Sequence, residues 1–97
     1  MIAFIAKLIV KNGKEADFEK YQTELSELSH ANEPGALLVY DVIRHQEESG
    51  HYVVYARFRD QAAFDAHMQA EHHDRLVPLI FDCLAEEMDL QFFQHVA

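Results

Sequence analysis

Histidine and acidic side chains gather between residues 67 and 74, the densest stretch of reactive groups in the sequence. His67 follows Phe64 by three residues, on the apolar face of a predicted helix, and His72 and His73 follow a helix break. A neutral imidazole beside a cavity can accept a proton from a substrate hydroxyl. We therefore predict His67 and His72 as catalytic residues. The alternatives are a hydrogen-bonded core histidine for His67 and solvated helix-start residues for His72 and His73.

A metal site is a second hypothesis for the same stretch. His67 and His72 could coordinate a metal ion together with Glu71 or Asp74. Their spacing does not match a strong pattern such as H-E-x-x-H, so we predict no metal ligands. The sequence contains only three glycines and no C-x-x-C, G-x-S-x-G or Gly-rich phosphate loop. We therefore predict no dinucleotide-binding or flavin-phosphate loop.

Aromatic and basic side chains are candidates for binding a small-molecule substrate. Tyr40 and Tyr52 lie on predicted neighbouring strands, where tyrosines more often pack in a core or an interface. Arg57 could hold an anionic oxygen, although arginines at strand edges more often pair with surface acids. The predicted substrate-binding residues are Tyr40, Tyr52, Arg57, Phe64, Met68, His73 and Phe81.

The elements that position these residues follow from hydrophobic periodicity. We predict four strands and two helical regions, in the order β-α-β-β-α-β. This order indicates an α+β, ferredoxin-like domain over residues 1–97, with a four-stranded antiparallel sheet and helices on one face. In the second helical region Asp60 is the predicted N-cap, and Pro78 is expected only in the first turn of the piece after the break. The predicted strands are 2–11, 35–45, 51–59 and 88–96, and the helical regions are 14–32 and 61–84, with a break near 70–73.

Large apolar residues occur on both faces of the predicted sheet. In the second strand, simple alternation assigns Leu38, Tyr40 and Val42 to one face and Leu37, Val39 and Ile43 to the other. Helices cover only one face, and sheet-sized apolar patches are unusual on monomers. We therefore predict a homodimer that packs sheet on sheet. The alternative is a monomer whose exposed sheet face carries a mixture of apolar and polar residues.

The composition excludes several classes of partner. Eight basic and seventeen acidic residues give a net charge of −9, so we expect no nucleic-acid binding and no attraction to anionic membranes. No apolar run approaches the roughly 20 residues of a membrane-spanning helix, and residues 1–10 are expected to form a strand rather than a signal peptide. Cys83 is the single cysteine. It excludes an internal disulfide and fits the cytoplasmic location that we expect.

Four segments together resemble the antibiotic biosynthesis monooxygenase family. They are Glu33-Pro34-Gly35 followed by Ala-Leu-Leu-Val-Tyr40-Asp, the stretch 55–60 (Tyr-Ala-Arg-Phe-Arg-Asp), the stretch 63–67 (Ala-Phe-Asp-Ala-His), and His72-His73. Their order and spacing extend the resemblance over nearly the whole chain. It implies a dimeric α/β barrel with a pocket between sheet and helices in each subunit. Several members oxidise phenolic or quinol substrates with O₂, without a metal or a flavin.

The resemblance also implies roles for individual residues. His67 matches the recurrent histidine of the family, and His72-His73 match a polar pair that follows it. Ala56 stands where many members have a glutamate. The implied activity is a cofactor-independent monooxygenase acting on a small phenolic or quinol-type substrate. The alternatives are a non-oxidative isomerase or lyase acting on a small carbonyl compound, and a ligand-binding module without turnover.

Overall fold

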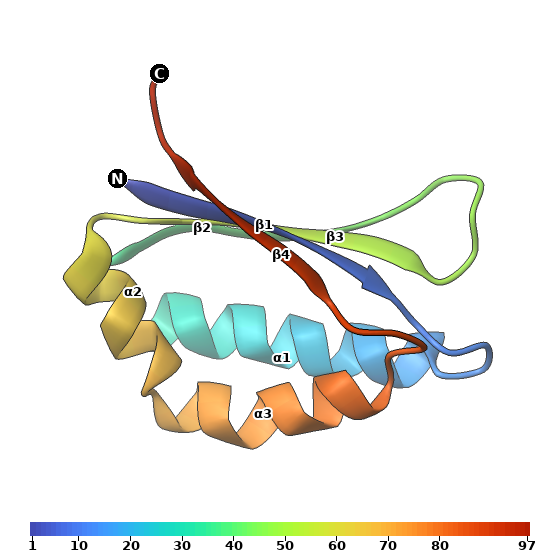
Figure 1. Cartoon of the computed structure of the whole chain (residues 1–97). Coiled ribbons are helices and arrows are strands. Elements are labelled where there is room, and N and C mark those ends of the chain that lie inside the picture. The colour runs from blue at the N-terminus through green and yellow to red at the C-terminus, as the bar shows by residue number, and fades with distance from the viewer.

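Four antiparallel strands and three helices make up the chain, whose computed structural model describes all residues from 1 to 97 (Figure 1). The sheet order is β2-β3-β1-β4, and the helices cover one of its faces. The predicted ferredoxin-like architecture is thus confirmed, with the second helical region divided into α2 and α3. The elements are β1 (Ile2–Ile9), α1 (Glu15–Asn32), β2 (Leu37–Arg44), β3 (His51–Phe58), α2 (Gln61–Met68), α3 (Glu71–Asp82) and β4 (Asp89–Gln94).

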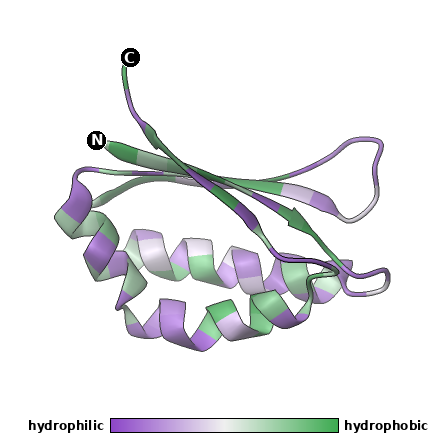
Figure 2. Cartoon of the chain, viewed as in Figure 1, coloured by the Kyte–Doolittle hydropathy of each residue, from purple (hydrophilic) through white to green (hydrophobic).

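The core lies between the sheet and the helices. Figure 2 shows hydrophobic residues along the strands and on parts of all three helices. Phe18 and Leu25 of α1, Leu76 of α3 and Phe58 of the sheet are almost completely buried in this core. Burial of each such side chain stabilises the fold by about 1.5 to 3 kcal/mol before the loss of conformational entropy is subtracted. None of the helices combines the length and the apolar character needed to cross a bilayer.

A bulge in β2 corrects the predicted alternation of that strand. Leu37 pairs with Phe58, but Val39 pairs with Arg57, so Leu38 is an extra residue in the ladder. The extra residue reverses the parity. Leu37 therefore joins Tyr40 in the buried core, and its assignment to the opposite face was wrong.

Pro78 lies inside α3 and not in its first turn, so that prediction was also wrong. Proline has no backbone N–H, and the carbonyl of Asp74 therefore lacks its normal helical donor. Both Pro78 and Asp74 are exposed, so water can reach this carbonyl. The cost of the missing hydrogen bond is thereby reduced, and the helix continues to Asp82.

Candidate active site

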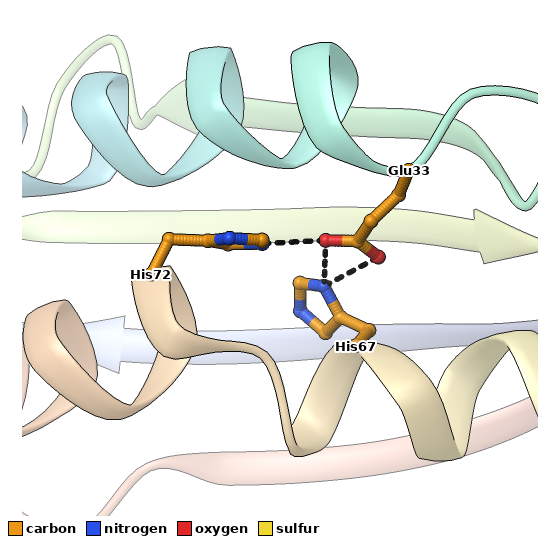
Figure 3. A group of neighbouring side chains, drawn as sticks. All are labelled: Glu33, His67 and His72. Atoms are coloured by element: carbon orange, nitrogen blue, oxygen red, sulfur yellow. Dashed lines mark hydrogen bonds and ion pairs between the residues drawn. The ribbon is translucent and has the colours of Figure 1, made fainter.

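Three polar side chains meet where the ends of the three helices come together (Figure 3). Glu33 is the C-cap residue of α1, His67 lies in the last turn of α2, and His72 lies in the first turn of α3. The Glu33 carboxylate accepts hydrogen bonds from His67 Nδ1 at 3.0 Å and from His72 Nε2 at 2.6 Å. The three side chains are only 10%, 2% and 8% exposed. One carboxylate is therefore held between two imidazoles, largely away from bulk water.

Local sequence explains how Glu33 and His67 reach this position. Pro34 disfavours helical backbone in the residue before it, so α1 ends at Asn32 and Glu33 becomes its cap. Gly35 follows with a φ of +76°, a left-handed conformation that permits the tight turn into β2. At the start of α2, the Asp60 carboxylate accepts a hydrogen bond of 2.8 Å from the backbone N–H of Ala63. This confirms Asp60 as the N-cap and fixes where the helix that carries His67 begins.

Contact with Glu33 sets the tautomer of His67. An ionised carboxylate only accepts hydrogen bonds, so the imidazole proton lies on Nδ1, and Nε2 keeps its lone pair. No protein group hydrogen-bonds to Nε2. Burial lowers the pKa of His67, and the hydrogen bond and negative charge of Glu33 oppose this shift in part. His67 is therefore a neutral imidazole with a free proton-accepting nitrogen.

A cavity of about 220 Å³ opens beside His67, between the sheet and the helices. Thirteen of its sixteen lining residues are hydrophobic. Since an apolar protein cavity of about 150 Å³ accepts benzene, this one has room for a compound of one or two small rings. Met68, Phe81 and Leu90 line the cavity and remain 45%, 47% and 39% exposed, so the entrance lies along the edge that they form.

The cavity also contains a few polar groups that could orient a ligand. The Tyr40 hydroxyl donates to Gln22 Oε1 at 3.2 Å. Burial, and next the negative charge of Glu33, raise the pKa of Tyr40, which keeps it a neutral phenol. The pKa of His73 is lowered, chiefly by burial and then by the neighbouring His67. An apolar wall with a few convergent polar groups is typical of a small-molecule site.

Most of the predicted site residues lie together. His67 and five predicted substrate-binding residues line the cavity: Tyr40, Phe64, Met68, His73 and Phe81. His72 is outside the cavity wall, but it binds the same carboxylate as His67.

Tyr52 and Arg57 lie elsewhere in the sheet. The Tyr52 hydroxyl donates to Glu19 Oε2 at 2.6 Å, and neither residue lines the cavity. Arg57 points to the other face of the sheet, where its Nη1 is 3.3 Å from both ring nitrogens of His95.

Sequence reasoning missed Glu33, the residue that joins the two histidines. No local pattern links it to the histidines, since it lies 34 residues before His67. The acids considered for a metal site do not reach the histidines in this way. Glu71 is 84% exposed and lies 3.6 Å from Arg75, and Asp74 is also exposed. The one available signal was the presence of Glu33 in the first of the four family-like segments.

Comparison with known sequences decides the family. The family described as antibiotic biosynthesis monooxygenase matches residues 1–79, which is most of the chain. The chain belongs to this family. Among curated proteins, none matches it.

Solved structures of antibiotic biosynthesis monooxygenases resemble the whole fold. A structure described by the family name is 31% identical with a TM-score of 0.89, and the match covers all of both chains. A Caulobacter crescentus protein described by the same family name is 28% identical with a TM-score of 0.92, over 99% of this chain and 90% of that one. A conserved protein from Methanosarcina mazei is 25% identical with a TM-score of 0.88, over 96% of this chain and 90% of that one.

Proposed function

We propose that this protein is a cofactor-independent monooxygenase that oxidises a small phenolic or quinol-type compound with O₂. Membership of the antibiotic biosynthesis monooxygenase family supports an oxygenase. The observation that carries the proposal is the Glu33–His67 pair at the wall of a small apolar cavity. It combines a proton acceptor with an environment that excludes water.

The first step is removal of a proton from the substrate. His67 Nε2 accepts the proton of the aromatic hydroxyl, and the ring becomes an electron-rich phenolate. The imidazolium that forms is stabilised by the Glu33 carboxylate at 3.0 Å. Tyr40 and His73 contribute polar groups at the cavity wall, where they can orient the oxygen atoms of the substrate.

The overall reaction balances without an external reductant. The substrate anion supplies electrons to O₂, one oxygen atom bonds to a ring carbon, and the other leaves as water. For a hydroquinone, the substrate and O₂ give a hydroxyquinone and water. The role of the protein is to deprotonate and orient the substrate and to exclude solvent.

Oxygen uptake by chelator-treated protein with a panel of hydroquinones, with mass analysis of the products, tests this function. Since a general base contributes roughly a hundredfold or more, we expect His67→Gln to lower the rate at least that much. Glu33→Gln should also lower the rate strongly, because its amide can donate to Nδ1 and favour the tautomer in which Nε2 carries the proton and cannot act as a base. His30→Gln, which changes an exposed histidine in the last turn of α1, is the control and should match the wild type.

Other outcomes would assign another function. Turnover of a carbonyl compound under anaerobic conditions would indicate the isomerase or lyase. Thermal stabilisation by a ligand without any product would indicate a binding module. Equal oxygen uptake by the wild type and His67→Gln would refute His67 as the base.

We also propose that the protein works as a homodimer in the cytoplasm. The sheet face opposite the helices carries Ile5, Ile43, Val53, Tyr55 and Phe93, as the register and burial of the strands indicate. Ile43 is 58% exposed and Phe93 is 45% exposed. A second sheet packed on this face would remove these side chains from water. The buried, unpaired thiol of Cys83 is consistent with a reducing compartment.

A further inference from the structure

We propose that Glu33, His67 and His72 form a binding site for a divalent transition-metal ion of the zinc class. One carboxylate oxygen and two imidazole nitrogens converge here from the ends of three helices (Figure 3). The donor atoms all lie within 4.8 Å of one another. This set differs from the ligands that sequence spacing suggested, because the acid comes from α1 and not from the stretch around the histidines.

The distances among the donors are close to those that a metal ion needs. Zinc binds nitrogen and carboxylate oxygen at about 2.0 to 2.1 Å, which places neighbouring donors of a tetrahedral site roughly 3.3 Å apart. Glu33 Oε2 lies 3.0 Å from His67 Nδ1 and 2.6 Å from His72 Nε2. A small opening of these hydrogen bonds would therefore admit the ion. Two imidazoles and a carboxylate suit zinc and its late first-row neighbours better than calcium or magnesium.

The charge of the cluster also favours a cation. The ion-pair partners of Glu33 are His67 and His72, with no lysine or arginine among them. Glu33 is therefore a nearly buried acid with no permanently charged partner in the chain. A buried charge without a permanent partner is costly. A divalent ion would supply that partner, and each imidazole proton would move to the ring nitrogen that faces away from the metal.

Solvent can reach one side of the cluster. The side chains of Glu33 and His72 are 10% and 8% exposed, whereas that of His67 is only 2% exposed. An ion can therefore enter past Glu33 and His72, and water can occupy a further coordination position there. The wall of the substrate cavity includes His67 but neither Glu33 nor His72.

Metal binding would have a consequence for the proposed reaction, and this part of the inference rests on the proposed function. A metal ion on His67 Nδ1 forces the imidazole proton onto Nε2. That nitrogen could then no longer accept a proton from a substrate hydroxyl. We therefore expect zinc to inhibit oxygen uptake by the protein.

Calorimetric titration of the chelator-treated full chain with Zn²⁺ tests the site directly. We expect one zinc ion per chain at this cluster, and we expect Glu33→Gln and His72→Gln each to weaken its binding by roughly tenfold or more. His51→Gln is the matched control, because His51 Nδ1 lies 3.3 Å from Glu48 in an exposed pair far from the cluster in sequence. This control should keep the high-affinity site. Equal zinc affinity in the wild type and Glu33→Gln would overturn the proposal.

A spectroscopic readout on the wild type covers the case in which these variants fail to fold. Zinc should shift the imidazole ring resonances of His67 and His72, and Co²⁺ should give the visible absorption of a low-coordinate nitrogen and oxygen site. Resonance shifts confined to His45 and His51 would place the ion at the hairpin and refute the site.

Binding and inhibition are separate results. Zinc affinity is measured without substrate, so the absence of quinol oxidation would refute the proposed function and leave the metal site decided by calorimetry. If zinc binds the cluster while oxygen uptake continues unchanged, the inference of inhibition is wrong.

Discussion

Individual hydrogen bonds set the protonation behaviour of residues at both ends of α1. At the end opposite Glu33, Glu19 accepts a hydrogen bond of 2.6 Å from the Tyr52 hydroxyl and one of 3.0 Å from Arg44. The Tyr52 bond lowers the pKa of Glu19 most strongly, and Arg44 lowers it further against the opposing effect of burial. The same bond, after burial itself, raises the pKa of Tyr52 to about 12. Tyr52 therefore acts as a donor that holds α1 on β3.

This bond predicts an effect of pH on stability. The pKa of Glu19 is lower in the folded state than its ordinary value of 4.5, so its contribution is present above pH 4.5 and is lost as the pH falls below it. Because the Glu19 side chain is 43% exposed, we expect Glu19→Gln to lower the free energy of unfolding at pH 7 by less than about 1 kcal/mol. The variant should also show a shallower loss of stability in acid, measured by urea unfolding between pH 3 and 7.

Glu24→Gln is the control for this prediction. Glu24 belongs to the same helix and contacts Arg75 at 3.1 Å, but it has no tyrosine donor. In this variant the free energy of unfolding should change with pH as steeply as in the wild type between pH 3 and 7. An identical slope in Glu19→Gln and the wild type would show that the Tyr52 bond is not maintained in solution.

Residue types near the cavity were predictable, whereas pairings across the chain were not. His67, Phe64 and Met68 could be found because helical periodicity places them on the face towards the sheet. Glu33 could not be assigned to His67 by any local pattern, since the contact depends on how α1 ends relative to α2. Tyr40 and Tyr52 look alike in sequence, and only the packing of α1 separates the cavity tyrosine from the one bound to Glu19.

At the scale of elements, α3 contains a proline that the helix accommodates at a cost. Replacing Pro78 with alanine would restore an N–H donor to the exposed Asp74 carbonyl. An interior proline costs a helix about 3 kcal/mol relative to alanine. Its rigidity offsets up to about 1 kcal/mol of this cost, because it lowers the conformational entropy of the unfolded chain. We therefore expect Pro78→Ala to raise the free energy of unfolding by about 1 to 2 kcal/mol in denaturant titrations at one fixed protein concentration.

Leu79→Ala is the comparison for Pro78→Ala. It changes the next residue of α3, which is 38% exposed, without changing any backbone donor. It should alter stability far less. A loss of stability in Pro78→Ala would mean that the proline ring makes a favourable contact that outweighs the missing hydrogen bond.

The elements themselves follow from short-range patterns, and the two errors concern features that these patterns do not contain. Alternation and turn residues gave the order of strands and helices correctly, because these signals act within a few residues. Alternation failed at Leu38, where one extra residue in β2 reverses the faces. The register of a bulge depends on the partner strand, so β2 alone does not contain it. The expectation that proline is tolerated only in the first turn of a helix neglects solvent. Water can reach the Asp74 carbonyl that Pro78 leaves without a donor.

At the scale of the whole molecule, the sheet has one face that its own helices cannot cover. The uncovered face is not purely apolar, because Lys7, Asp41 and Arg57 lie among its hydrophobic residues. Arg57 Nε is buried and has no hydrogen-bond partner, an arrangement that is costly in a finished structure. An acceptor from a second copy would satisfy this group. The unpaired Arg57 Nε and the apolar residues of this face therefore both favour a homodimer.

Tyr55 lies near the centre of this face, where it pairs with Ile5 on β1 and with Asp41 on β2. A glutamate at this position would put an unpaired negative charge beside Asp41 and would be buried on association, at a cost of several kcal/mol. We expect the wild type to sediment at micromolar concentration as twice its mass of 11.2 kDa, and Tyr55→Glu to sediment as a single chain. Gln46→Glu adds the same charge to the exposed hairpin loop and should leave the dimer intact. A wild-type particle of 11.2 kDa would rule out the dimer, and Arg57 Nε would then need a partner within its own chain or from solvent.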